Sequence, residues 1–296
     1  MSNKRYLIAS LFLMIFVSGC GGGKEATTVE SIETEKPKII TIGGTITEIV
    51  SALGEFESIV ATDPTSTFPE AAKELPSLGY RNAIKAEGLI SLGSDVIIAE
   101  NGHLSEEVKQ QLSSAGTNWY EVENQYTVEG TLNMIDEVAG ILNLEEMAVS
   151  LKQELEESIN ELELKVQARE EKPIVLIVYA RGAGSLTIGG SDTFAETLFP
   201  LAGCTLAVPE IEGFKPLTTE ALVQANPDYI LFFDSGLASL GGVEGALEIP
   251  GVSQTIAGQK KQIIAMDGLL LSGFGPRLHK ALNTLFELTE ATEQGN

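Results

Sequence analysis

Two passages recur in the same order in the two halves of the chain, and this internal repeat constrains the fold more than any other feature. The first half contains GGTITEIVSALG (Gly43–Gly54), and the second contains GGSDTFAETLFPLAG (Gly189–Gly203). Further on, KAEGLISLGSDVIIAE (Lys85–Glu100) is matched by TTEALVQANPDYILFF (Thr218–Phe233). Both of these carry a Glu, an Asp eight residues later, and then an apolar run. Since repeated passages indicate repeated structural units, we expect a chain with two similar lobes.

Apolar runs rich in β-branched residues alternate with helical stretches in both halves. In the first half they read KIITI, IVATD, VIIAE and NWYEVE, and in the second IVLIVYA, SLTI, YILFFD and IIAMD. Buried strands separated by helices are typical of α/β proteins with mostly parallel sheets. The pattern therefore predicts two Rossmann-like α/β lobes. It also directs attention to the loops after the strands, because such sheets bind ligands at the carboxyl ends of their strands.

The segment between the two halves has the pattern of a single long helix. Apolar residues recur every three or four positions from Leu144 to Val166, so one face is apolar and the others are charged. A packed helix should restrain the two lobes more than a loop would. The predicted division is an N-terminal lobe over residues 38–143, a connecting helix over 144–172 and a C-terminal lobe over 173–290.

The first 20 residues have the order of an export signal. Two basic residues precede the 12-residue apolar stretch Tyr6–Val17, which is too short to span a bilayer. The segment ends in VSGC, which resembles the lipobox of bacterial lipoproteins. That resemblance implies a signal peptide over residues 1–19 and a lipid on Cys20, with cleavage without lipid as the alternative. Residues 20–37 then read as a flexible tether, and the protein as exported, membrane-anchored and facing the periplasm or the cell exterior.

The composition excludes several classes of function. A formal net charge of −23 argues against nucleic acid as a partner and against charge-driven binding to anionic lipid. Besides Cys20 the chain has only Cys204, whose apolar setting PLAGCTLAV is typical of a buried structural thiol. Its two histidines lie far apart in the sequence, which does not suit the nitrogen-rich site of a Zn or Mn receptor.

Three of the four arginines outside the signal stand in Gly-flanked motifs. Arg81 lies in LGYRN, Arg181 in YARGAG and Arg277 in GFGPR, whereas Arg169 belongs to the charged connecting segment. In so acidic a protein this placement favours an anionic ligand, because a guanidinium pairs with carboxylates through parallel donors. Ordinary surface arginines near turns are the alternative.

The passages GGTITEIVSALG, LGYRNAIKAEG, VYARGAG and GFGPR resemble those of the periplasmic haem-binding proteins of bacterial ABC importers, whose two lobes are joined by a helix. The resemblance runs from about Lys38 to Leu288. It implies a substrate-binding protein, not an enzyme, that captures haem b between the lobes and delivers it to an ABC permease and its ATPase. The alternatives are a cobalamin or ferric-siderophore receptor of the same fold and a periplasmic tetrapyrrole-modifying enzyme. The chain contains no G-x-S-x-G, P-loop or H-E-x-x-H motif.

The resemblance also implies roles for single residues. Tyr80 would be the axial ligand of the haem iron, since a phenolate is a hard oxygen donor with precedent in haem ligation. Arg81 would support that phenolate or hold a propionate, but relatives usually carry the arginine two positions after the tyrosine, where this chain has Asn82. Arg181 and Arg277 would hold propionates.

The resemblance also implies roles in binding the iron from its second side and in docking onto the permease. Some relatives supply a second axial ligand, often a His, near the position of Arg181, and its absence here leads us to expect five-coordinate iron. His103 is a possible second ligand, although a solvated loop histidine before the helix start at Ser105 is the favoured interpretation. Glu87 and Glu220 match the glutamates with which related proteins dock onto a permease. First-turn acids that complement a helix dipole are the alternative, and both interpretations can hold together.

Overall fold

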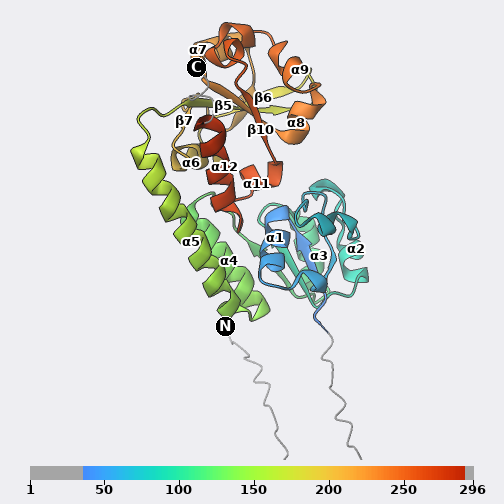
Figure 1. The fold of residues 1–296 in the computed structure, drawn as a ribbon. Helices are drawn as coiled ribbons and strands as arrows, with labels where there is room; N and C mark the ends of the chain where they lie inside the picture. The colour runs from blue at the N-terminus through green and yellow to red at the C-terminus, as the bar shows by residue number, and fades with distance from the viewer. Residues whose placement is uncertain (1–35, 291–296) are drawn as a thin grey trace, which may run out of the picture. The chain divides into compact units, whose positions relative to one another are not determined.

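The computed structural model describes residues 36–290 of the chain (Figure 1). The predicted signal over residues 1–19, Cys20 and most of the predicted tether lie outside the described residues. The described part contains two sheets, both of them layered with helices, so the predicted α/β fold with two mostly parallel sheets is confirmed. Between residues 36 and 290, no helix has the length and apolar character needed to cross a membrane.

The first sheet is entirely parallel and has the strand order β2-β1-β3-β4. Its central strand β1 is completely buried, as expected for a parallel strand with helices on both faces. The strands are β1 Ile39–Ile42, β2 Ile59–Ala61, β3 Val96–Glu100 and β4 Trp119–Val122. The helices are α1 Gly44–Ala52, α2 Ala86–Ser91, α3 Glu106–Ser114 and α4 Val128–Leu142, with the 3-10 turns η1 Phe56–Ser58, η2 Glu70–Glu74 and η3 Arg81–Ala83.

The second sheet is mixed, with the order β10-β9-β5-β6-β8 and with β7 paired to the start of β5. Its strands are β5 Ile174–Ala180, β6 Leu186–Gly189, β7 Thr205–Leu206, β8 Phe214–Pro216, β9 Tyr229–Phe233 and β10 Ile263–Met266. Strands β7 and β9 pair in parallel with β5, and β10 pairs in parallel with β9. Strand β6 is antiparallel to both of its neighbours, β5 and β8. β6 is antiparallel because only a short turn, at Gly182 with a φ of 73°, separates it from β5, and a parallel pair needs a long crossover.

The remaining helices of the described residues belong to the second half. They are α6 Phe194–Leu201, α7 Thr219–Ala225, α8 Asp234–Ser239, α9 Val243–Leu247, α10 Ile256–Gln259, α11 Gly268–Ser272 and α12 Leu278–Glu290, with the 3-10 turn η4 Val252–Gln254.

The repeated aspartate has the same structural task in both halves. The Asp95 carboxylate accepts a hydrogen bond from the backbone N–H of Lys38 at 2.8 Å, just before β1. The Asp228 carboxylate accepts the same bond from Ile174 at 2.8 Å, at the start of β5. The helix–strand pairs α2–β3 and α7–β9 are therefore equivalent elements. The other repeated passage is less regular, because its strands are the parallel β1 in one half and the antiparallel β6 in the other.

The long helix between the halves is α5, Glu145–Ala168. Its fully buried residues, Ala148, Leu155 and Leu162, recur every seven positions along one face. This face packs against α4 and α12, which run beside α5 in Figure 1. One apolar cluster joins residues of both sheets to these three helices, so the helix is part of a shared core rather than a free linker. The exact lobe boundaries stay a prediction.

The GFGPR motif belongs to the second half of the sequence but is hydrogen-bonded to residues of the first half. The carbonyl oxygen of Gly273 accepts hydrogen bonds from Thr45 Oγ1 at 3.0 Å and from Asn124 Nδ2 at 2.8 Å. The next carbonyl, that of Phe274, accepts one from Thr131 Oγ1 at 2.8 Å. These bonds fasten the connection between α11 and α12 to α1 and α4.

Candidate functional site

A cavity of about 460 Å³ opens at the carboxyl ends of the parallel strands of both sheets. That volume lies within the range of roughly 300–1,000 Å³ typical of small-molecule sites. The position is the one that the alternating strands and helices predict. The lining residues from the first half are Gly44, Thr45, Thr65, Thr67, Arg81, Glu100, His103 and Tyr126. Those from the second half are Tyr179, Phe233, Asp234, Ser235, Asp267, Gly268, Leu269, Ser272 and Gly273.

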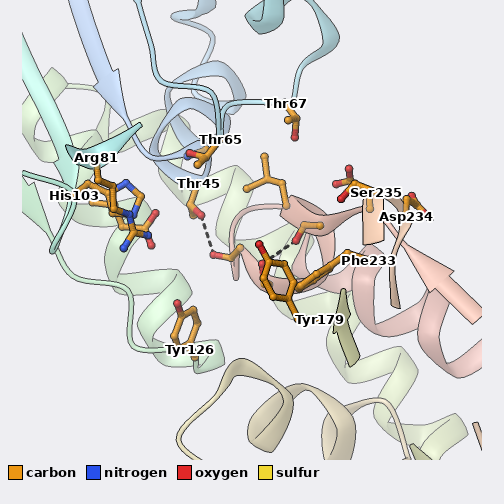
Figure 2. Close-up of a pocket in the computed structure, with 17 residues that line it drawn as sticks. Thr45, Thr65, Thr67, Arg81, His103, Tyr126, Tyr179, Phe233, Asp234 and Ser235 are labelled. Carbon is orange, nitrogen blue, oxygen red and sulfur yellow. Dashed lines mark hydrogen bonds between the residues drawn. The ribbon is translucent and has the colours of Figure 1, made fainter. Parts of the chain in front are cut away.

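Aromatic rings line the cavity from both halves. Tyr179 and Phe233 lie together on one wall, with ring centroids 5.7 Å apart, and Tyr126 lies on the other side (Figure 2). Tyr126 is held edge-on against the buried Phe274, at 5.6 Å between ring centroids. Such rings offer flat apolar surface to a flat ligand.

Tyr179 is a lining residue that the sequence analysis did not assign. Its hydroxyl oxygen accepts a hydrogen bond of 2.8 Å from Arg181 Nε, and the guanidinium lies 5.2 Å from the ring centroid. Arg181 itself is exposed and is not among the lining residues. The signal was present in YARGAG, since Arg181 follows Tyr179 by two positions, the spacing expected around Tyr80.

Tyr80 lies beside the cavity and not among its lining residues. Its side chain is 68% exposed, and it directly precedes the turn η3. Gly79 before it adopts a φ of 77°, which turns the chain sharply at this point. The next residue, Arg81, does line the cavity, and within residues 36–290 its guanidinium makes no hydrogen bond or ion pair. The structure thus brings an unpaired cation into the cavity and places an exposed phenol next to it.

Arg277 is held away from the cavity by a contact with α1. Its guanidinium forms an ion pair of 2.9 Å with Glu48, whose other carboxylate oxygen accepts the Arg277 backbone N–H at 3.1 Å. The guanidinium also lies over the Phe68 ring, 3.7 Å from its centroid. Because these partners occupy the cation, it has a structural role that the sequence analysis did not anticipate.

His103 is buried, so the interpretation as a solvated loop histidine is wrong. Only 5% of the residue is exposed, it lines the cavity next to Arg81, and its Nδ1 has no hydrogen-bond partner among the described residues (Figure 2). The segment Glu100–Leu104 turns inward at the end of β3 because apolar Leu104 is also buried. Between residues 36 and 290, no group of three or more His, Cys, Asp or Glu side chains is arranged to hold a metal ion.

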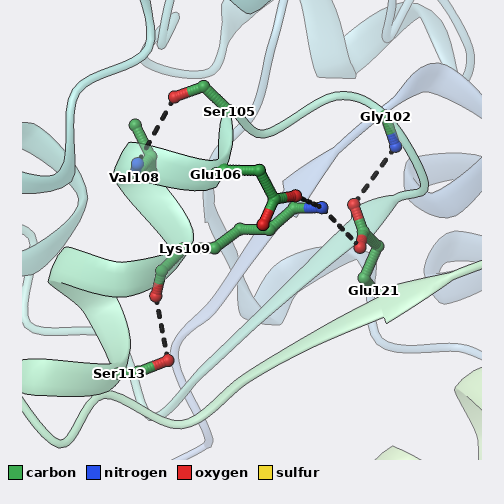
Figure 3. Close-up of polar contacts among 7 residues, drawn as sticks. All are labelled: Gly102, Ser105, Glu106, Val108, Lys109, Ser113 and Glu121. Atoms are coloured by element: carbon green, nitrogen blue, oxygen red, sulfur yellow. Dashed lines mark hydrogen bonds and ion pairs between the residues drawn. The ribbon is translucent and has the colours of Figure 1, made fainter.

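A polar clamp fixes the loop that carries His103 (Figure 3). Lys109 Nζ donates to Glu121 at 2.8 Å and to Glu106 at 2.9 Å, so one cation links α3 to β4. The second oxygen of Glu121 accepts the backbone N–H of Gly102 at 3.1 Å. Since Gly102 is adjacent to His103, these bonds restrain the backbone next to the imidazole.

Burial of His103 predicts a specific pH dependence of stability. Desolvation, and then the nearby Arg81, lower the pKa of His103 from 6.5 to about 4. On acidification, His103 is therefore protonated near pH 6.5 in the unfolded chain but only near pH 4 in the folded chain. A group with a depressed pKa contributes stability above pH 6.5 and loses it on acidification, here about 3 kcal/mol between pH 6.5 and 4.

A His103→Gln variant should lack this contribution. Its free energy of unfolding, measured with urea at pH 7 and pH 4.5, should change with pH by less than that of the wild type. Titration of the other groups is common to both proteins and cancels in the comparison. Parallel pH profiles for the two proteins would show that His103 titrates normally in the folded chain.

Glu100 is a second lining residue that the sequence analysis missed. Burial raises its pKa, partly offset by a hydrogen bond of 3.3 Å from Asn124 Nδ2. Burial, followed by the charge of Asp267, also raises the pKa of Asp234 on the opposite wall.

Glu87 and Glu220 lie outside the cavity, at equivalent places. Each is exposed in the first turn of its helix, Glu87 in α2 and Glu220 in α7. Cys204 is buried, as its apolar setting predicts.

Two α/β sheets around one shared core, with a ligand-sized cavity at their facing strand ends, define a two-lobed ligand-binding protein. The model of the periplasmic binding protein family matches residues 39–269. The chain therefore belongs to the periplasmic binding protein family, whose members are binding and transport proteins.

The structure is similar to those of periplasmic haem-binding proteins, which confirms the resemblance seen in the sequence. The apo form of RhuT from Roseiflexus sp. RS-1 is 32% identical, with a TM-score of 0.82 over 86% of this chain and 100% of that one. BhuT in complex with two haems is 34% identical, with a TM-score of 0.81 over 86% of this chain and 97% of that one.

Relatives found by sequence have more varied ligands. The uncharacterised ABC transporter substrate-binding lipoprotein YvrC of Bacillus subtilis is 27% identical over 87% of this chain and 81% of its own length. The Fe(3+)-citrate-binding protein YfmC of the same organism is 26% identical over 79% of this chain and 80% of its own. The vitamin B12-binding protein of Vibrio parahaemolyticus is 25% identical over 55% of this chain and 63% of its own.

Proposed function

We propose that this protein captures haem between its two lobes and delivers it to the permease and ATPase of an ABC importer. The observation that carries the proposal is the chemistry of the cavity. The cavity combines flat aromatic walls, the unpaired guanidinium of Arg81 and the phenol of Tyr179, whose oxygen accepts a hydrogen bond from the Arg181 guanidinium. These groups suit a flat apolar ring that carries carboxylates and a hard metal ion. The haem-binding proteins to which the structure is similar support the same ligand.

The iron would be bound by phenolate oxygen from one or both halves. Tyr80 remains the ligand that the family resemblance implies. Its side chain is exposed, and the next residue, Arg81, lines the cavity. Tyr179 offers a second oxygen from the other half. Arg181 donates to it, and a cationic donor is complementary to a negatively charged ligand oxygen. We therefore replace the expectation of five-coordinate iron with six-coordinate iron, in which Tyr179 supplies a second axial phenolate. His103 is the less favoured alternative for this second ligand.

The propionates would be bound chiefly by Arg81. Within residues 36–290 its guanidinium is unpaired, whereas Nε of Arg181 is used by Tyr179 and Arg277 is used by Glu48. Arg181 keeps its terminal nitrogens for a second carboxylate. We assign Arg277 to holding the GFGPR segment in place rather than to a propionate.

The test compares hemin with its dimethyl ester, in which both propionates are uncharged. Wild-type protein should bind hemin with a Soret band of tyrosinate-ligated ferric haem. An Arg81→Ala variant should bind hemin about 10- to 100-fold more weakly, because a hydrogen bond to a charged group contributes about 1.5–3 kcal/mol. The same substitution should hardly change affinity for the ester, as both absorbance titrations would show.

A Lys85→Ala variant is the matched control, since Lys85 is an exposed cation four residues away that does not line this cavity. Equal losses for hemin and the ester would rule out a propionate contact at Arg81. Failure of the wild type to bind hemin, with binding of ferric citrate or cobalamin instead, would move the protein to the alternative ligand class.

Export and docking complete the proposal. A lipid on Cys20 would hold the protein at the membrane, and the relative YvrC is itself described as a lipoprotein. Glu87 and Glu220 would contact basic residues of the permease, one glutamate for each half.

A further inference from the structure

Two carboxylates lie side by side on the second-half wall of the main cavity. Asp234 directly follows strand β9, and Asp267 directly follows strand β10. The last residues of these strands, Phe233 and Met266, are partners in a parallel pair, so the two aspartates leave the sheet at adjacent positions. Both line the cavity, and within residues 36–290 neither forms an ion pair. Burial and then the charge of Asp267 raise the pKa of Asp234 with no offsetting cation, so this wall carries negative charge that the fold leaves uncompensated.

The helices that begin at these positions do not explain both charges. The Asp267 carboxylate accepts the backbone N–H of Leu270 at 2.8 Å and so caps helix α11. A neutral Asn or Ser would cap the helix as well. Asp234, in the first turn of helix α8, makes no side-chain hydrogen bond within the described residues. The repulsion from these two carboxylates therefore acts mainly on whatever occupies the cavity.

The positive charge of the cavity lies on the opposite wall. Among the described residues that line the cavity, Arg81 alone carries a guanidinium or ammonium group, and it lies across the cavity from Asp234 (Figure 2). The third lining carboxyl group, Glu100, belongs to the first half and accepts a hydrogen bond of 3.3 Å from Asn124. A carboxylate of the ligand is therefore attracted at Arg81 and repelled at the two aspartates.

We propose that Asp234 and Asp267 make the cavity selective for iron porphyrins whose carboxylates lie on one edge of the ring. This inference rests on the proposed function, since it concerns the choice of ligand in the same cavity. Haem carries its two propionates on one edge, so only uncharged substituents meet the aspartates when the propionates lie at Arg81. A ring with carboxylates on all sides brings like charges together whichever way it is turned, and such repulsion is an effective means of rejecting a wrong ligand.

Iron coproporphyrin III is the matched probe, because it carries propionates at the two positions where hemin has vinyl groups. Absorbance titrations at pH 8 keep the solution well above the usual pKa of an aspartate. The wild type should bind iron coproporphyrin III at least about tenfold more weakly than hemin, because close like charges disfavour binding. Equal affinities for the two porphyrins would overturn the inference.

An Asp234→Asn, Asp267→Asn double variant should reduce this preference for hemin by about tenfold, since Asn keeps the shape of Asp without its charge. The single variant Asp234→Asn leaves the cap of α11 untouched and should give part of the change. The methyl esters of both porphyrins control for size and polarity. Their affinity ratio should be the same for the wild type and the double variant. A double variant that keeps the wild-type preference for hemin would contradict the role of the aspartates.

A Glu244→Gln, Glu248→Gln double variant is the matched control. It also removes two carboxylates from the second half, but both glutamates are exposed at helix α9 and neither lines the cavity. This control should keep the wild-type ratio of affinities. An equal change in both double variants would show that net charge, rather than the two aspartates, sets the preference. Absence of hemin binding by the wild type would instead contradict the proposed function, so the two failures are distinguishable.

Discussion

Hemin bound to a Tyr80→Phe, Tyr179→Phe double variant should lose the spectrum of tyrosinate-ligated ferric haem, and its affinity should fall by at least about tenfold. The physical reason is that the two hydroxyl oxygens proposed as iron ligands, one from each half, are removed while the ring surfaces stay. The two single variants should differ from the wild type in different ways. Tyr80→Phe removes the ligand that the family resemblance implies, and Tyr179→Phe removes the oxygen that Arg181 supports at 2.8 Å.

Absorbance and electron paramagnetic resonance spectra of the four proteins distinguish one phenolate from two. If only Tyr80 binds the iron, Tyr179→Phe should leave the spectrum unchanged. Tyr120→Phe is the matched control, because Tyr120 is exposed on β4 and does not line the cavity. A double variant that keeps the wild-type tyrosinate spectrum would exclude both phenols and direct attention to Tyr126, the remaining phenol that lines the cavity.

A Glu48→Ala variant should be less stable than the wild type by about 3–5 kcal/mol, the usual loss when one partner of a buried ion pair is removed. The side chain of Glu48 is 4% exposed and that of Arg277 is 16% exposed, so water cannot fully replace the lost carboxylate. Nε of Arg277 already lacks a hydrogen-bond partner among the described residues. Urea denaturation at pH 7 measures the free energy of unfolding.

Glu57→Ala provides the comparison, since Glu57 is an exposed glutamate nearby in the sequence and has no ion pair within residues 36–290. Its stability should lie within about 0.5 kcal/mol of the wild type, as is usual for surface substitutions. If Glu48→Ala and Glu57→Ala were equally stable, Arg277 would have a solvated alternative position. It would then again be available to a propionate.

The strands could be predicted from the sequence because β-branched apolar runs have one favourable environment, a buried sheet. All eight of the predicted runs form strands, from KIITI at β1 to IIAMD at β10. The short strands β7 and β8 were missed, since Thr205–Leu206 and Phe214–Pro216 are too brief and too polar to have a pattern. Their pairing depends on the strands beside them rather than on their own residues.

The candidate site could be predicted only in part. Arg81 stands in a family motif and lines the cavity, as expected of a ligand-binding residue. His103 is buried in a loop that Lys109 and Glu121 restrain at Gly102, and these two residues come from two other elements. The pairing of Arg277 with Glu48 joins residues 229 positions apart. No local pattern reports such contacts, which exist only after both halves have folded together.

The shared core around α5 has a consequence for how the protein can be divided. The apolar cluster that contains Leu155 and Leu162 also contains Ile39 of β1 and Ile177 of β5. A fragment that ended before α5, or one that began after it, would expose the apolar surface that this helix covers. The two halves therefore look like duplicated modules along the sequence, but neither is a self-sufficient folding unit.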